Sequence, residues 1–134
     1  MNAKKLSFLL LILVAGACTN RSTSSEQDEM RHWNNVLQQI NALLLENKAQ
    51  QTLDLAKQTL PEILESAEKN GTTDTLIYYA RKIFNACGNN YINTKQYKDG
   101  IDYMDSIGNH PLIREHCPHE LLSFKAGLNQ LYGN

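Results

Sequence analysis

The sequence predicts an all-α protein built from antiparallel helical hairpins. Apolar residues recur at intervals of three and four along most of the chain, which is the period of amphipathic helices. Short polar turns separate these periodic stretches, whereas β-branched runs and Gly/Pro clusters, the usual signs of strands, are few. We therefore expect a leader at residues 1–17, a flexible tether at 18–29 and one helical domain at 30–134.

The leader has the features of a secretion signal. Lys4 and Lys5 precede the apolar run LSFLLLILV (6–14), which is too short to cross a bilayer. Small residues at 15–17 then lead directly to Cys18, and this junction resembles a bacterial lipoprotein cleavage site. The resemblance implies removal of residues 1–17 and a lipid on Cys18. An ordinary signal peptide cut near residue 17, with Cys18 incidental, is the alternative.

The tether has no bulky apolar side chain from Thr19 to Glu29, so it is expected to stay solvated. Thr19 stands where some bacterial lipoproteins carry an aspartate that retains them in the inner membrane. We therefore expect a lipid-anchored protein of the bacterial cell envelope, with the outer membrane favoured, facing the periplasm or the cell surface.

Composition excludes several classes of protein. The 117 residues that follow the leader have the size of one small domain. A net charge of −1 and a sequence pI near 6.4 give no basic surface for nucleic acid. After the leader, the sequence contains no second apolar run long enough to span a membrane.

The first two helices are expected at about Asp28–Glu46 and Ala49–Lys69, with Asn47-Lys48 as the turn between them. Each carries one apolar stripe: Trp33, Leu37, Ile40 and Leu44 in the first, and Ala49, Leu53, Ala56 and Leu60 in the second. Pro61 has three interpretations, as the end of the second helix, the start of a new one or a kink. We favour a kinked, continuous helix that ends at Asn70-Gly71, because the apolar face continues beyond the proline.

A cap cluster at Thr72–Asp74 predicts a third helix from Thr75 to about Asn93. A fourth is expected from Tyr97 to Ile107, before Pro111, which lacks the N–H that a helix needs. Gly88 and Gly100 lie on the apolar faces of these two helices, where small residues would let facing backbones approach closely.

The stretch from Phe84 to Pro111 resembles one tetratricopeptide repeat, a helix-turn-helix unit. Ile107 stands where the family prefers Ala, and Pro111 comes one residue early; the matching positions are Phe84, Gly88, Tyr91, Tyr97, Gly100 and Met104. Residues 33–61 follow the same register without the usual turn glycine. The start-to-start spacing of 51 residues from Trp33 to Phe84 resembles that of the elongated repeats in extracytoplasmic sensor regions of some Bacteroides-type signalling proteins. The resemblance implies a short α-solenoid of stacked hairpins that binds other proteins.

The last helix is expected from His119 to about Tyr132, after Pro118 at its start. Its apolar residues occupy two neighbouring faces, so we expect both faces to be covered. In the resembled family a glycine at the distance of Gly133 marks the turn into a partner helix, which implies a repeat cut in half. Three alternatives remain: a capping helix, the N-terminal piece of a longer chain, or self-association through this helix.

Asparagines on the third helix are the main candidates for a ligand or peptide groove: Asn85, Asn89, Asn90 and Asn93, together with Tyr91. The resemblance implies that they flank a concave surface formed by helices 75–93 and 119–132. Asn amides can hold a peptide backbone, and Asn is a poor helix former, so its repeated use favours a role in binding. The alternative is a solvated helix face.

Two cysteines and three histidines could form a disulfide or a metal site. A disulfide between Cys87 and Cys117 is permitted in an oxidising compartment, and two buried free thiols are the alternative. His116, Cys117 and His119, with His110 nearby, offer nitrogen and sulfur donors. Structural zinc needs four well-placed ligands and the sequence has no Cys-x-x-Cys, so we expect no metal and no cofactor.

Together these patterns predict an interaction module without catalytic activity, whose partner is a protein or peptide of the envelope. The sequence contains no nucleophile–base pair, no Gly-rich phosphate loop and no carboxylate pair in an apolar setting. One alternative is the N-terminal sensor fragment of a membrane-bound two-component signalling protein. Another is a small metal-binding envelope protein that uses His116, Cys117 and His119.

Overall fold

The computed structural model describes residues 25–134; the leader and Cys18 lie outside the described residues. The described chain belongs to two compact units, residues 25–34 to the first and 35–134 to the second. Residues 25–34 are helical. Nη1 of Arg31 lies 3.4 Å from Oδ1 of Asp28, and the ring of Trp33 is edge-on to that of His32. Residues 25–29 are therefore helical where the sequence predicts a tether.

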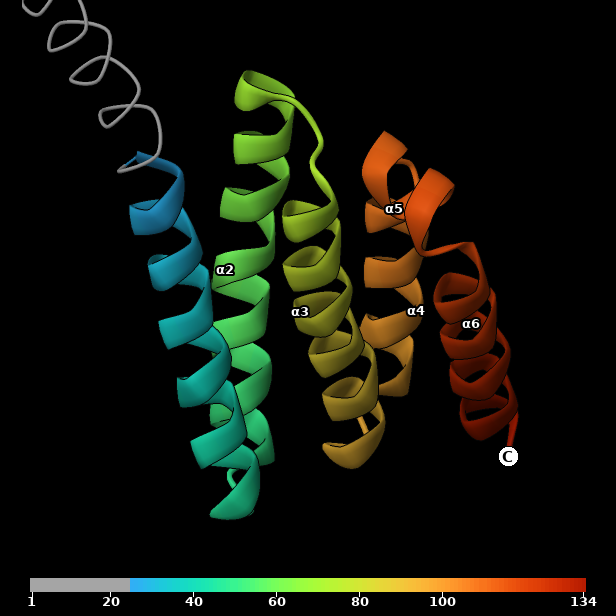
Figure 1. Cartoon of the computed structure of the whole chain (residues 1–134). Helices are drawn as coiled ribbons and strands as arrows, with labels where there is room; N and C mark the ends of the chain where they lie inside the picture. The colour runs from blue at the N-terminus through green and yellow to red at the C-terminus, as the bar shows by residue number, and fades with distance from the viewer. Residues whose placement is uncertain (1–24) are drawn as a thin grey trace, which may run out of the picture. The chain divides into compact units, whose positions relative to one another are not determined.

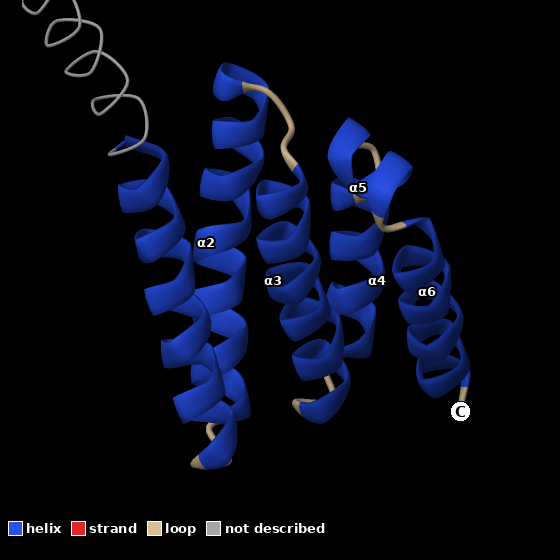
Figure 2. Ribbon diagram, viewed as in Figure 1, coloured by secondary structure: helices blue, strands red, loops and turns tan. Residues whose placement is uncertain are grey.

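The second unit is all-α, as predicted. Over the described residues the structure has six helices and no strand (Figure 2). They are the helix at residues 25–45, which enters this unit at Asn35, α2 (Ala49–Asn70), α3 (Asp74–Asn93), α4 (Tyr97–Ile107), α5 (Pro111–His116) and α6 (Pro118–Gly133). Helices α2, α3 and α4 alternate in direction, and α6 runs antiparallel to α4 (Figure 1).

Two of the turns share one geometry. In the first, Asn47 has a φ of 58°, its N–H donates to Leu44, and the N–H of Lys48 donates to Leu43. In the second, Lys95 has a φ of 59° and the same two bonds connect residues 95 to 92 and 96 to 91. Both turns thus end their helices with a left-handed residue whose bonds satisfy the last carbonyls.

Pro61 lies inside α2, which continues through it to Asn70, as predicted for a continuous helix. Gly71, at a φ of 89°, follows as the expected stop. Thr73 then caps α3, because its hydroxyl accepts the N–H of Leu76 at 3.2 Å.

Helix α5 is absent from the prediction. In the sequence, Pro111 predicts only the end of the preceding helix, and α4 does end at Ile107. Pro111 also opens α5, because a proline in the first turn forfeits no helical hydrogen bond. Cys117, with φ −126° and ψ 35°, interrupts the helical backbone, and Pro118 opens α6.

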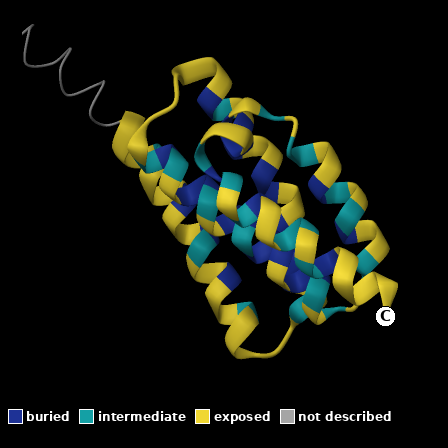
Figure 3. Cartoon of the chain, turned by 90° about the vertical axis from the view of Figure 1, so that its right-hand side faces the viewer, coloured by how far each residue is buried: buried dark blue, intermediate teal, exposed yellow. Residues whose placement is uncertain are grey.

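The core lies where the helices meet, and exposed residues face outward (Figure 3). Helix α2 packs along α3, α4 packs along α6, and α3 also contacts α4, α5 and α6. The largest fully buried apolar side chains are Leu53, Leu60, Ile63, Ile83, Phe84, Met104, Ile113 and Leu128.

Gly88 and Gly100 do occupy crowded crossings; Gly100 meets α3 as expected, but both glycines also meet α6, and the nearest atoms to Gly88 all belong to α6. A Cβ at Gly88 would lie 2.5 Å from the ring of Phe124, so this glycine admits an aromatic ring of α6 rather than the backbone of α4. A Cβ at Gly100 would lie 3.0 Å from Leu128 and from Cβ of Tyr91. Both glycines thus seat α6 against the preceding hairpin.

Helix α6 is covered on one side only within the described structure. Leu121 and Leu128 are buried, whereas Leu122 is 65% exposed and Leu131 and Tyr132 are also exposed. At 100° per residue, Leu122 and Leu131 point in opposite directions. The expectation that both apolar faces would be covered is therefore wrong for the described residues, and their exposed apolar side chains form no single patch.

Candidate functional site

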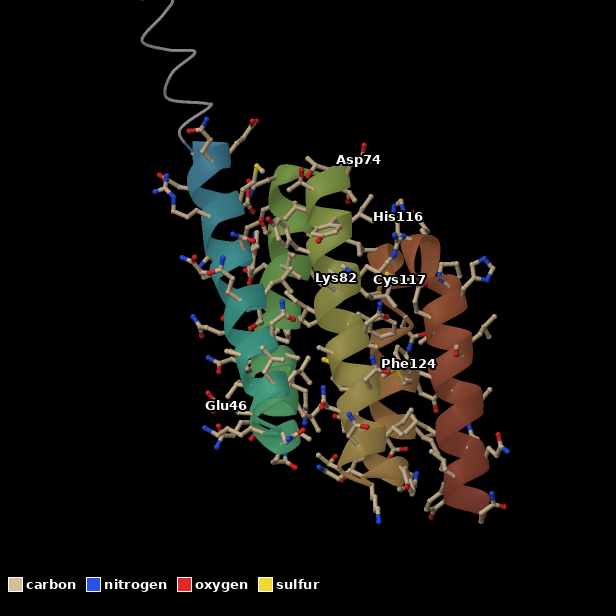
Figure 4. All side chains as sticks on the ribbon, turned by 60° about the horizontal axis from the view of Figure 1, so that its bottom comes forward. Glu46, Asp74, Lys82, His116, Cys117 and Phe124 are labelled. Carbon is tan, nitrogen blue, oxygen red and sulfur yellow. The ribbon has the colours of Figure 1, made fainter. Side chains whose placement is uncertain are left out.

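A row of polar side chains follows one face of α3. Its five members recur at intervals of three and four residues: Tyr78, Lys82, Asn85, Asn89 and Asn93. We call this row the polar face of α3. All are exposed except Asn85, which is half-buried, and Figure 4 shows Lys82 on α3 and Phe124 on the neighbouring α6. Three of the predicted groove residues, Asn85, Asn89 and Asn93, are therefore members of this face.

Lys82 gives the polar face its charge. Its Nζ lies 5.6 Å from the centre of the Tyr78 ring, within reach of a cation–π contact. Within the described part of the chain, Lys82 has no carboxylate at ion-pair distance. Its ammonium group is thus free to pair with an acidic group from outside the chain.

Asn85 provides an unused acceptor. Its amide oxygen is buried and receives no hydrogen bond from any described residue. A buried polar atom without a partner costs about 1–3 kcal/mol. Because this oxygen is closed to solvent, the Asn85 side chain would have to turn outward before an N–H group of a partner could reach it.

Asn90 and Tyr91, the other two predicted groove residues, belong to the core. Asn90 is fully buried, and its Nδ2 donates to the carbonyl of Ala86 at 2.8 Å. Tyr91 is 2% exposed, and its ring packs against Tyr103 with 5.3 Å between ring centres. Their sides of α3 are covered by other helices, which a prediction from spacing along one helix does not reveal.

A shallow hollow of about 300 Å³ lies at the C-terminal end of α3. Its lining residues are Leu44, Asn47, Lys48, Ala49, Asn90 and Asn93. Lys48 in this lining is already paired with Glu46. The hollow therefore meets the polar face only at Asn93.

Cys87 and Cys117 are both buried free thiols, so the structure does not contain the disulfide that the sequence permits. Sγ of Cys87 lies 3.8 Å from the hydroxyl of Tyr103, and burial raises the pKa of Cys87 to about 12. Burial likewise raises the pKa of Cys117, and the Glu120 carboxylate acts in the same direction. A thiol that stays protonated is a poor nucleophile, so both cysteines are packing residues here.

Arg81 connects three helices, and the sequence analysis missed it. Its Nη2 donates to the carbonyl of His116 at 2.7 Å, and its Nε lies 3.3 Å from Oε1 of Glu120. These contacts fasten the end of α5 and the first turn of α6 to α3. Only its place one turn before Asn85 could have drawn attention to it, because its acceptors lie 35 residues or more away.

The predicted alternative metal site is not assembled. His116 and Cys117 lie at the junction of α5 and α6 (Figure 4), and His119 is exposed. Among residues 25–134, no three His, Cys, Asp or Glu side chains are placed so that they could hold one ion.

The polar face offers amides, one ammonium group and one phenol, which suit recognition by hydrogen bonds and charge.

None of the helices between residues 25 and 134 has both the length and the apolar character to cross a bilayer. No protein-family model, curated protein or solved structure matches this chain.

Proposed function

We propose that the protein is a non-catalytic interaction module of the bacterial cell envelope, anchored by a lipid on Cys18. Its hairpins would stack in the manner of tetratricopeptide repeats, and the polar face of α3 would bind an extended segment of a protein partner. The observation that carries the proposal is a row of hydrogen-bonding side chains on α3, none of which bonds to another helix among the described residues.

The composition of the face supports a binding role. Asn costs an exposed helix position roughly 0.5–0.7 kcal/mol relative to Ala, yet Asn89 and Asn93 are both exposed on α3. Neither forms a hydrogen bond to another helix among the described residues; Asn93 donates only to Asn90, one turn away, at 3.5 Å. Their helix cost is therefore not offset by packing.

The stacking of helices supports the repeat-like arrangement. Gly88 and Gly100 stand where the resembled family carries small residues, and a Cβ at either would meet side chains at 3.0 Å or less. Phe84 meets Phe124 edge-on, with 5.7 Å between ring centres. Helix α6 thus packs on the side of α3 that carries Phe84 and Gly88, and the polar face stays open.

The test is site-specific photocrosslinking in the native envelope. A photoreactive residue in place of Asn89 should give one or a few discrete adducts. The matched control places the same residue at Glu62, which is also exposed but lies on α2. Adducts from Asn89 should fade at least severalfold when Lys82→Ala is added, because the charge that steers the partner is lost.

Lys82→Ala must leave the thermal midpoint unchanged, since a surface substitution of this kind alters stability by about 0.5 kcal/mol or less. The same adducts from Glu62 as from Asn89, or none from Asn89, would remove the polar face as the binding surface.

A further inference from the structure

His110 holds the start of α5 through both of its ring nitrogens. Nδ1 accepts the backbone N–H of Leu112 at 3.2 Å, which makes His110 the N-cap of α5. Nε2 lies 2.9 Å from Oε1 of Glu68 on α2. The ring therefore connects α5 to a helix 42 residues earlier in the chain.

These two contacts select one tautomer of the neutral ring. Because the N–H of Leu112 donates to Nδ1, that nitrogen carries a lone pair and no hydrogen. The single hydrogen of the neutral imidazole is then on Nε2, where it donates to the Glu68 carboxylate. A second proton can enter only at Nδ1, where it would point at the N–H that is now capped.

We propose that acid opens α5: a proton from solvent binds Nδ1 of His110 and thereby removes the cap of the helix. The protonated ring stays on the Glu68 carboxylate and loses the N–H of Leu112, so α5 loses its cap. Histidine is the one side chain whose unperturbed change of charge falls between about pH 5 and 8.

Other charged side chains close to His110 or Glu68 in the sequence are exposed. They are Lys69 of α2, Asp105 of α4, and Arg114 and Glu115 of α5. Lys69 is paired with Glu65 at 2.7 Å and Asp105 with Lys125 at 3.2 Å. The Glu68 side chain is itself 63% exposed, so water screens the ion pair that forms on protonation.

The rest of α5 explains why its cap matters. The helix has only six residues, too few to be stable by itself. Leu112 and Ile113 hold it in the core, and Arg81 holds its last carbonyl. Loss of the cap therefore removes one of two polar attachments and increases opening of residues 111–117.

Hydrogen exchange of the full chain, followed by mass spectrometry at pH 7.5 and pH 5.0, tests whether acid opens α5. Protection factors, corrected for the intrinsic rate at each pH, should fall roughly fivefold or more for peptides covering 111–117. Peptides from α3 should keep their protection, which distinguishes local opening from general unfolding.

His110→Asn is the matched variant, because Asn also caps helices but takes up no proton in this range. It should keep α5 protected at both pH values. His110→Ala, which cannot cap, should show low protection of 111–117 at pH 7.5 already. Equal protection of 111–117 in the wild type at both pH values would overturn the proposal, as would the same loss at pH 5.0 in His110→Asn.

Discussion

The two sides of α3 differ in what they contact. On the packed side, Phe84, Cys87 and Gly88 are buried, and a Cβ added at Gly88 would strike the ring of Phe124. On the polar face, Lys82 and Asn89 are exposed and have no partner in another helix among residues 25–134. One helix thus separates the residues that hold the fold from the face that we propose for binding, so substitutions can test the two independently.

Gly88 provides the largest expected effect. Gly88→Leu should lower the free energy of unfolding by roughly 3 kcal/mol, since the new side chain would overlap Phe124 at a crowded crossing. Denaturant unfolding measures the change. Gly88→Ala should cost less, and its cost should shrink in a Phe124→Ala background because the clashing ring is gone. An unchanged midpoint for Gly88→Leu would mean that α6 does not pack here.

Cys87 tests the packed side through pH. Burial raises the pKa of Cys87 to about 12, whereas an unfolded cysteine titrates near 8.5–9. Above pH 9 the unfolded chain therefore loses a proton that the folded chain keeps, and stability should fall by about 1.4 kcal/mol per pH unit until about pH 12. Below pH 9 this contribution is fully present and constant.

Cys87→Ala should give a shallower loss of stability between pH 9 and 12. Some loss should remain in this variant, because burial also raises the pKa of Tyr103 above its usual value. Urea midpoints measured across this range decide the matter. Parallel curves for the wild type and Cys87→Ala would show that the thiol is not buried as described.

Gly127 of α6 sharpens the comparison with the smallest effect and the opposite sign. A Cβ at Gly127 would meet nothing within 4 Å, in contrast to Gly88. Gly127→Ala should therefore stabilise the protein by about 0.5–1 kcal/mol through helix propensity alone. Thermal unfolding of the two glycine-to-alanine variants side by side should show shifts in opposite directions. A loss of stability in Gly127→Ala would place an unseen neighbour against α6.

Local signals in the sequence predicted most of the helices. Apolar periodicity located α2, α3 and α4 nearly to the residue, and Thr73 and Gly71 marked their limits. Helix α5 escaped because six residues show no period, and one proline can both follow one helix and open the next.

The candidate site was predicted less well, because it depends on contacts between distant residues. Spacing placed Asn85 and Asn89 on one face of α3, but it also placed Asn90 and Tyr91 beside them, where neighbouring helices cover the chain. The ring that contacts Gly88 belongs to Phe124, 36 positions later, and the partner of His110 is Glu68, 42 positions earlier. Periodicity reports which residues share a side of a helix, and it does not report what faces that side.

The single non-helical residue between α5 and α6 fixes the length of that junction. An insertion or deletion at Cys117 would shift and rotate α6 relative to α5, because no other loop residue lies between the two helices to absorb the change. Phe124 would then leave Gly88, and Leu128 would leave Gly100, in one step. Added residues at the exposed segment Gly71-Thr72 would cause no such rotation. Evolution can therefore lengthen this protein between α2 and α3 far more readily than at the joint before its last helix.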